Sequence, residues 1–326
     1  MPDRSVTVAI PVRNGGELLR GVLDALARQT VRHELLVCDS GSSDGSPASA
    51  RAYGARVIEI DANTFGHGST RNLLLGEARG EHVALLSQDA EPADERWLEL
   101  LLGGFALGQD VAIVYGPYRP RPEAAAGLRM ELEAWFRLLA PDGRPRVDRL
   151  QARERTRLPA VALMGARGFF TDANACISRE AWRRVPFREV PYAEDRALAL
   201  DMLRAGYAKT YVPEAAVLHS HDYTAMQQLR RCFDEWRGLR EIYGWREPGS
   251  PRRVLGQLRG ELGQARRELA SAGVPPARRC STLAEVTRHN VVRQAGALLG
   301  SRADALPAAA RRALSLERRG SFAPLD

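Results

Sequence analysis

The sequence predicts an α/β fold with a mostly parallel central sheet, followed by a helical C-terminal region. Short apolar runs alternate with amphipathic segments over the first two thirds of the chain, which is typical of right-handed βαβ units. These runs end in polar or acidic residues, as in His82–Pro92, where Asp89 and Glu91 follow the apolar residues. Around 252–270 the apolar residues recur at helical spacing instead.

The composition sets broad limits on the chain. Its 326 residues, of which 44% are hydrophobic, suffice for one large domain or two ordinary ones. It has no apolar run of the length of about 18 residues that a membrane span needs, and Met1–Arg4 lacks the apolar core of a signal peptide. The four cysteines are far apart and show no zinc spacing, so we expect a reducing cytoplasm. They are Cys38, Cys176, Cys232 and Cys280.

The charge divides unevenly along the chain. The net charge is +7, and the residues from 222 onward contain 19 arginines against 11 acidic residues. This shift predicts a boundary between a domain over 1–221 and a basic α-helical region over 222–326. The helix expected at 252–270 is basic and amphipathic. It can lie on an anionic membrane, or it can pack on the rest of the chain or on a partner subunit.

The predicted elements follow one another in βαβ order. The segment 141–159 is polar, has no clear period and is expected to be mobile. Strands are expected at 5–11, 34–38, 56–60, in the stretch 82–92, which Pro92 ends, and at 111–116, 169–178, 207–212 and 216–218. Helices are expected at 17–29, 46–53, up to about 78, 97–105, 123–139, 179–185 and 196–204.

The turns after the first two strands exclude two common nucleotide sites. The first turn is Arg13–Gly16 and contains no G-x-G-x-x-G, and no P-loop occurs in the chain. Asp39 and Asp44 follow the second strand, where a carboxylate can accept hydrogen bonds from a nucleobase or a ribose. For Asp44, a helix N-cap or an Asx turn is the alternative.

A glycine-rich segment, 65–72, precedes the next helix. Its glycines allow close approach of a ligand, and Arg71 offers a planar charge suited to phosphate. His67 can contact phosphate or sugar, or be structural.

Asp89 and Glu91 stand at a strand end and can bind Mg²⁺ or Mn²⁺, which prefer oxygen ligands. The alternative is a solvated acidic turn that caps the next helix. His219 and His221 can join such a site or belong to an ordinary surface loop.

Two further polar pairs lie in the second half of the predicted domain. Asp172 and Asn174 alternate along an apolar run, so they should face the same side, a cleft. Glu194 and Asp195 open a helix, where acids also compensate the helix dipole.

Together these segments resemble the inverting family 2 glycosyltransferases of the GT-A fold, over roughly residues 5–221. Two loops, 65–72 and 87–90, are most similar to the bacterial rhamnosyltransferase branch, which uses dTDP-L-rhamnose to build O-antigen, capsule or cell-wall glycans. The segments that carry the resemblance are Val8–Asn14, Val37–Ser46, Thr70–Asn72, Gln88–Ala90, Asp172–Asn174 and Glu194–Asp195.

The resemblance implies a GT-A catalytic domain over 1–221, with the donor side at about 1–116 and the acceptor side at about 117–221. Asp39 would bind the donor base, and Asp195 would be the catalytic base, with Glu194 beside it. Asp89 matches the last residue of the D-x-D motif, whose first aspartate is replaced by Ser87. The other residues implied are Pro11, Arg13, Asn14, Asp44, His67, Arg71 and Gln88 for the donor, Asp172 and Asn174 for the acceptor, and Glu91, His219 and His221 for Mg²⁺ or Mn²⁺ beside Asp89.

The expected reaction is transfer of a sugar from a nucleotide-diphosphate donor, with inversion, to a glycan or a lipid-linked acceptor. The expected location is the cytoplasm, with contact to the inner face of the plasma membrane through the basic helices, and no nucleic-acid partner is expected. Two alternatives are a family member that uses a UDP-sugar and a weakly catalytic nucleotide-sugar-binding protein, which Ser87 keeps open. A nucleotidyltransferase would need a glycine-rich triphosphate-binding signature that the chain lacks.

Overall fold

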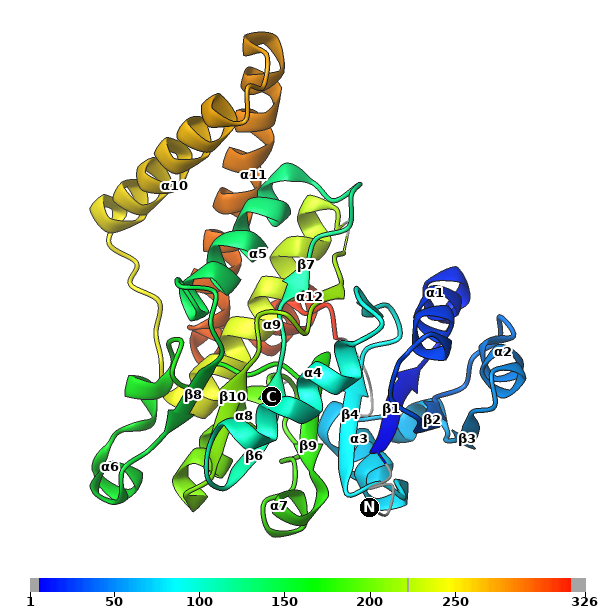
Figure 1. The fold of residues 1–326 in the computed structure, drawn as a ribbon. Coiled ribbons are helices and arrows are strands. Elements are labelled where there is room, and N and C mark those ends of the chain that lie inside the picture. The colour runs from blue at the N-terminus through cyan, green and yellow to red at the C-terminus, as the bar shows by residue number, and fades with distance from the viewer. Residues whose placement is uncertain (1–5, 222, 318–326) are drawn as a thin grey trace. The chain divides into compact units, whose positions relative to one another are not determined.

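A computed structural model describes residues 6–221 and 223–317 (Figure 1). The ends of the two predicted domains, at 1–5, 222 and 318–326, lie outside the described residues. The described chain forms two compact units: unit 1 comprises 6–119 and 136–219, and unit 2 comprises 120–135, 220–221 and 223–317. The segment 120–135, which the sequence predicts within the domain over 1–221, belongs instead to unit 2 with the C-terminal helices, where Gly127 packs directly against His289.

Unit 1 is built on an eight-stranded sheet in the order β3-β2-β1-β4-β9-β6-β10-β8. Six strands run in one direction, and β8 and β9 run against them, so the predicted, mostly parallel α/β sheet is confirmed. The strands are β1 Val6–Val12, β2 His33–Asp39, β3 Arg56–Glu59, β4 His82–Leu86, β6 Val111–Tyr115, β8 Arg146–Arg149, β9 Asn174–Ser178 and β10 Ala208–Tyr211.

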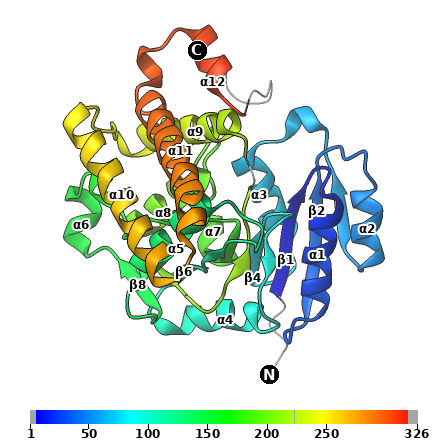
Figure 2. The ribbon, with the colours of Figure 1, turned by 90° about the horizontal axis from the view of Figure 1, so that it is seen from above.

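Helices cover both faces of this sheet, as right-handed crossovers require. The helices α1 and α2 lie on one face, and α3 lies on the other (Figure 2). The buried face of α1 carries Leu19, Val22, Leu23 and Leu26, which pack into one core with the strands and with Trp97. The helices of unit 1 are α1 Gly16–Ala27, α2 Ser46–Ala52, η1 Ala62–Thr64, α3 His67–Glu77, α4 Trp97–Gly103, η2 Gly104–Leu107, α6 Ala152–Arg157, η3 Ala160–Leu163, α7 Arg179–Arg184 and α8 Glu194–Ala205.

A small second sheet joins two distant loops of the chain. Its order is β5-β11-β7, formed by Glu91–Pro92, Val217–Leu218 and Tyr118–Arg119. In this sheet β5 is antiparallel to β11, with Leu218 opposite Glu91. The residues just before β5 therefore lie beside those just after β11, which brings the Asp89 loop next to His219.

The segment expected to be mobile, 141–159, is folded. It contains β8, which pairs with β10, and α6. Asp148 of β8 is buried and accepts a hydrogen bond from Lys209 at 2.7 Å, and Leu150 is also buried. The polar composition hid this strand because the charge of Asp148 is neutralised in part by Lys209, which is 61 positions away in the sequence.

Unit 2 is helical, as predicted, and its long helices are α9 Ala225–Tyr243, α10 Pro251–Ser271 and α11 Pro276–Gly300. The helices α9 and α11 pack closely at Gly296 and Gly300, which leave room for the backbone of α9. The helices α10 and α11 lie side by side as a hairpin (Figure 1). The remaining helices are η4 Ala303–Ala305, α12 Ala308–Leu314 and α5 Ala126–Leu139, which begins in unit 2 and ends in unit 1. Among the described residues, no helix is both long and apolar enough to cross a membrane.

Candidate active site

Three loops meet at the carboxyl ends of β1, β2 and β4, and we call them the donor-side loops: 13–16, 39–46 and 87–90. The first loop is tied to the second by its backbone: Gly15 N donates to Ser46 Oγ at 2.9 Å, and Gly16 N donates to Asp44 Oδ2 at 2.9 Å. Asn14 accepts from the Ser43 amide at 2.8 Å and has a φ of +49°, which asparagine tolerates better than most residues.

Gln88 ties the first loop to the third. Its Oε1 accepts from the Arg13 amide at 2.8 Å, and its Nε2 donates to the Arg13 carbonyl at 3.2 Å. Pro11 lies in β1 two residues earlier, half-buried and opposite Cys38. The side chains of Arg13 and Asn14 are exposed, so this loop presents a fixed backbone with two polar side chains at its surface.

Asp39, at the end of β2, is buried, with an exposed fraction of 3%. Its Oδ2 accepts from the amides of Gly41 and Ser42 at 3.0 and 2.9 Å. Its Oδ1 is buried and has no hydrogen-bond partner in the described part of the chain. Because a buried carboxylate oxygen without a donor is costly, this atom suits a ligand that offers an N–H or O–H.

Asp44 is exposed and holds the loops together. Its Oδ1 accepts from the hydroxyl and the amide of Ser46, and these hydrogen bonds lower the pKa of Asp44. The Asx turn that the sequence left open is therefore what the structure contains.

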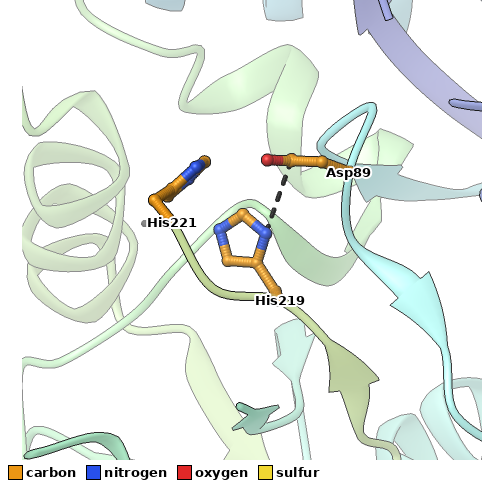
Figure 3. Close-up of side chains that lie close together, drawn as sticks. All are labelled: Asp89, His219 and His221. Carbon is orange, nitrogen blue, oxygen red and sulfur yellow. Dashed lines mark ion pairs between the residues drawn. The ribbon is translucent and has the colours of Figure 1, made fainter. Parts of the chain in front are cut away.

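Asp89, His219 and His221 converge beside the small sheet (Figure 3). Each offers one ligand atom, and these atoms lie within 4.8 Å of one another. Asp89 Oδ1 lies 3.4 Å from His219 Nδ1. One carboxylate with two imidazoles fits Mn²⁺ better than Mg²⁺, because Mg²⁺ prefers an all-oxygen shell.

Glu91 is not part of this group. It lies in β5, and its carboxylate approaches α1 at Gly21, where an added Cβ would lie 3.3 Å from Glu91 Oε2. The expectation that Glu91 is a metal ligand beside Asp89 is therefore not supported, because the side chain of Glu91 in β5 approaches α1. Ser87 donates its backbone N–H to Ala173 at 3.3 Å, which joins the Asp89 loop to the Asp172 loop.

Three carboxylates, Asp172, Glu194 and Asp195, form what we call the carboxylate cluster, and Arg71 of α3 enters it. Arg71 is 7% exposed. Its Nε lies 2.5 Å from Asp172 Oδ2, its Nη2 donates to Asp172 Oδ1 at 2.9 Å, and its Nη1 lies 3.0 Å from Glu194 Oε1. His67 Nδ1 lies 3.9 Å from the same Glu194 oxygen. The structure therefore pairs Arg71 with carboxylates, where the sequence suggested a phosphate.

Asp195 is half-buried, and its Oδ1 accepts from the Arg196 amide at 2.6 Å. Burial raises the pKa of Asp195 well above its usual range, and the charges of Asp172 and Glu194 raise it further. Burial also raises the pKa of Asp172 to about 7, against the Arg71 guanidinium, which lowers it. A carboxyl group with a raised pKa can hold and release a proton near neutral pH.

Asn174 is placed differently from the expectation. Its side chain is fully buried. Its Nδ2 donates to the carbonyls of Pro117 and Ala215 at 3.1 and 2.9 Å, and its Oδ1 accepts from Trp97 Nε1 at 2.8 Å. An acceptor-binding role is not supported, because every polar atom of this side chain already serves the protein.

Two residues were missed by sequence reasoning. Ala193 has a φ of +64° immediately before Glu194, a conformation that costs a non-glycine residue about 1–2 kcal/mol. Lys209, the only lysine in the chain, is fully buried between Asp148 and Tyr115, and burial lowers its pKa to about 8. One lysine in an arginine-rich chain, inside an apolar strand, was a signal that could have been read.

Comparisons with known proteins agree with this geometry. The model of the glycosyl transferase family 2 matches residues 7–183. The chain is 31% identical over 239 residues to the O-antigen chain rhamnosyltransferase RfbN of Salmonella typhimurium, covering 70% of each chain. It is 30% identical over 236 residues to the O-antigen chain rhamnosyltransferase WbaN of Salmonella anatum, covering 71% of this chain and 70% of that protein. Among solved structures, the mannosyltransferase PcManGT of Pyrobaculum calidifontis, in complex with GDP-Man and Mn²⁺, superposes with a TM-score of 0.58 at 18% identity over 90% of this chain and 86% of that chain.

Proposed function

The chain belongs to glycosyl transferase family 2, and from that premise we propose that it transfers L-rhamnose from dTDP-L-rhamnose to a glycan or lipid-linked acceptor with inversion. The sugar is proposed because two O-antigen chain rhamnosyltransferases are about 30% identical to it over 70% of their length. The observation that carries the proposal is the meeting, at one edge of the sheet, of the donor-side loops and the carboxylate cluster, joined by the hydrogen bond between Ser87 and Ala173.

The donor base is assigned to Asp39. Its buried Oδ1 is the acceptor that an N–H of a pyrimidine base would complete. Arg13, Asn14 and Gln88 form the fixed rim beside it, and the backbone at Gly15 and Gly16 lets the diphosphate approach closely.

The divalent cation is assigned to Asp89, His219 and His221, whose ligand atoms are close enough to share one ion. When bound there, the cation would offset the negative charge that grows on the diphosphate leaving group. The replacement of an aspartate by Ser87 leaves Asp89 as the one carboxylate of the set, and the two imidazoles supply the other ligands. This set supports Mn²⁺ as the ion.

Asp195 is assigned as the general base. It accepts the proton of the acceptor hydroxyl as that oxygen attacks the anomeric carbon from the face opposite the leaving diphosphate. The sugar gains oxocarbenium character as its bond to the diphosphate breaks, and the single displacement inverts the anomeric centre. A raised pKa suits Asp195 to this role, since it increases the proton affinity of the carboxylate.

The experiment is a donor panel followed by NMR. Purified protein is incubated with dTDP-L-rhamnose or UDP-glucose, in Mn²⁺ or in EDTA, with and without an acceptor glycan. We expect Mn²⁺-dependent consumption of dTDP-L-rhamnose and a product of inverted anomeric configuration. Preferred use of UDP-glucose would favour the UDP-sugar alternative, and tight donor binding without consumption would favour a binding protein.

The basic α10 is proposed to bring the enzyme to an anionic membrane on the cytoplasmic side, where a lipid-linked acceptor would lie. The side of α10 that carries the buried Ala265 and Glu261 faces α11, and Glu261 pairs with Arg293. On a different side of α10, an exposed arginine recurs every seven residues. Because residues seven apart lie on the same side of a helix, these arginines form one row about 21 Å long. This row consists of Arg252, Arg259 and Arg266, with Leu255 exposed beside it.

Flotation with liposomes tests this surface. Wild-type protein should float with vesicles containing phosphatidylglycerol at low salt and be released by salt, because the attraction is electrostatic. Charge reversal of the row should abolish flotation, whereas reversal of three exposed arginines of unit 1 should not. Equal flotation of both variants, or none by the wild type at low salt, would reject the surface. The matched control residues are Arg28, Arg137 and Arg204.

A further inference from the structure

The segment Thr70–Asn72 is part of the pattern that resembles the family, and the resemblance implies a donor-binding role for its Arg71. It lies inside α3, and its side chains are directed into the protein. Thr70 and Arg71 are buried, with exposed fractions of 2% and 7%. Removing the guanidinium of Arg71 from water is costly, so its contacts inside the protein indicate its role.

Neighbouring residues of α3 fasten the helix to the chain that leads into α8. Asn72 Nδ2 donates to the Phe187 carbonyl at 2.9 Å, and its Oδ1 accepts from the Phe187 amide at 3.0 Å. The same oxygen accepts from Trp182 Nε1 at 2.8 Å. One turn earlier, Gly68 packs against the backbone of Arg188 with no room for a side chain. The first turns of α3 therefore act as a support for the segment 182–194.

Arg71 extends this support to the carboxylate cluster. Its guanidinium makes a two-pronged contact with Asp172, from the loop before β9, and a third contact with Glu194, the first residue of α8. Its Nη1 also donates to the His67 carbonyl at 3.0 Å, which fixes the guanidinium on its own helix. Three elements far apart in sequence thus meet at one planar cation, an arrangement that the fixed fork of arginine suits and that lysine cannot reproduce.

Among the described residues, Arg71 forms ion pairs with Asp172 and Glu194, whereas Asp195 accepts its hydrogen bond from the Arg196 amide. Asp195 stands next to Glu194 in the first turn of α8, which starts from the left-handed residue Ala193. Holding Glu194 therefore sets the position of that turn, and with it the direction of the Asp195 side chain.

We propose that Arg71 is a positioning residue for Asp195: it clamps Asp172 and Glu194, fixes the start of α8, and leaves Asp195 as the carboxylate that exchanges a proton. The proposal rests on the assignment of Asp195 as the base. It gives Thr70–Asn72 a role on the acceptor side instead of on the donor phosphates.

The charged groups around Asp195 define the electrostatic part of the test. Asp172 comes from the loop before β9, Glu194 and Arg196 come from α8, and Arg71 and His67 come from α3. One negative neighbour fewer should favour ionised Asp195, and loss of the Arg71 charge should favour protonated carboxylates in the cluster.

The test compares Arg71→Lys and Arg71→Met by kcat, donor KM and the acidic limb of the pH profile. Arg71→Lys keeps the charge but cannot bridge two carboxylates. It should lower kcat roughly 10- to 100-fold and leave the donor KM and the limb in place. Arg71→Met should lower kcat at least as much and move the limb to higher pH. Adding Asp172→Asn to Arg71→Met should bring the limb back toward its wild-type position, because the net charge of the cluster is restored.

Arg56→Lys is the matched control. Arg56 also bridges two elements of unit 1, through Glu34 and Glu77, but makes no contact with the carboxylate cluster. It should lower the melting temperature without changing kcat or the limb. A raised donor KM with normal kcat in the Arg71 variants would indicate that Arg71 binds the diphosphate of the sugar donor, and would overturn the proposal. Wild-type values of kcat, KM and limb in Arg71→Lys would overturn it as well. If Asp195→Asn is fully active, the base assignment itself has failed.

Discussion

The donor-side loops and the carboxylate cluster lie at the same edge of one sheet but are held in different ways. The donor-side loops are joined mostly by backbone amides and short polar side chains, as where Gly15 donates to Ser46 and Gln88 pairs with Arg13. The carboxylate cluster is held by one buried guanidinium that reaches Asp172, 101 residues away in sequence. The first region is a rigid rim whose function depends on shape, and the second is a balance of charges whose function depends on protonation. Substitutions should therefore affect donor binding on one side and the pH profile on the other.

The largest effect is expected at the group of Asp89, His219 and His221, for which we propose a divalent cation. Asp89→Ala removes the only carboxylate of the set and should lower divalent-ion-dependent turnover more than about 100-fold, since even residues that merely support ligands commonly cost 10- to 100-fold. The melting temperature should change little, because Asp89 lies in a loop at a strand end. The check is turnover across a Mn²⁺ titration. If Asp89→Ala retains wild-type turnover at every Mn²⁺ concentration, Asp89 is not a ligand.

The next effect distinguishes the carboxylate cluster by pH. Asp195 must be ionised to accept a proton, and its pKa is raised by burial and by Asp172 and Glu194. Turnover should therefore be full above the raised pKa and fall about tenfold per pH unit below it. Asp172→Asn removes a negative neighbour and should shift this acidic limb to lower pH. A limb that stays in place in Asp172→Asn would show that another group titrates.

Asp39→Asn tests the rim. The amide in this variant keeps the shape of the side chain but has one hydrogen-bond acceptor fewer. An N–H of the nucleotide base of the sugar donor would then be left unpaired in a buried site. This costs about 1–3 kcal/mol, and the donor KM should rise roughly 5- to 150-fold with little change in the acidic limb. Asp44→Asn is the matched control, because Asp44 is exposed and braces the loop. Equal increases in KM for both variants would mean that loop structure, not base contact, explains the loss.

The smallest effect compares the two left-handed residues. The donor-side loop uses Asn14, a residue that tolerates a positive φ, whereas the chain before the carboxylate cluster uses Ala193, which does not. Ala193→Gly should therefore raise stability by up to about 1 kcal/mol, measured by urea denaturation. The same variant should lower kcat, because a more flexible start of α8 holds Asp195 less firmly. Stabilisation with an unchanged kcat would show that the strain at Ala193 has no part in placing the base.

Features that depend on local patterns could be predicted from the sequence, whereas features that depend on contacts between distant residues could not. The alternating strands and helices, the order of the donor-side loops and the helical C-terminal region follow from local patterns, because each is encoded within about ten residues. The position of Asp39 at the end of its strand and the Asx turn at Asp44 could be predicted for the same reason. Local pattern predicted no strand at β8, because the charge of Asp148 is neutralised in part by Lys209, which is remote in sequence.

The roles of single polar residues were harder to predict where they depend on tertiary contacts. Asn174 and Arg71 are of residue types that often bind ligands. Their partners inside the protein, Trp97 and Asp172, cannot be inferred from the spacing of residues in the sequence. Glu91 looked like a ligand because it follows Asp89 by two residues, but strand pairing turned it toward α1. Sequence patterns predicted candidate residues for the site, and the ion pairs and strand register determine which of them can face a substrate.

The most direct test of this account is the turnover of Asp195→Asn. The amide can still accept from the Arg196 N–H that Asp195 Oδ1 bonds, but it cannot take a proton, so the fold should be kept and the chemistry lost. We expect transfer from dTDP-L-rhamnose to fall by about 10²- to 10⁴-fold, with donor affinity and melting temperature close to those of the wild type. Near-wild-type transfer to the same acceptor would contradict the account, and Glu194 would then be the next residue to substitute.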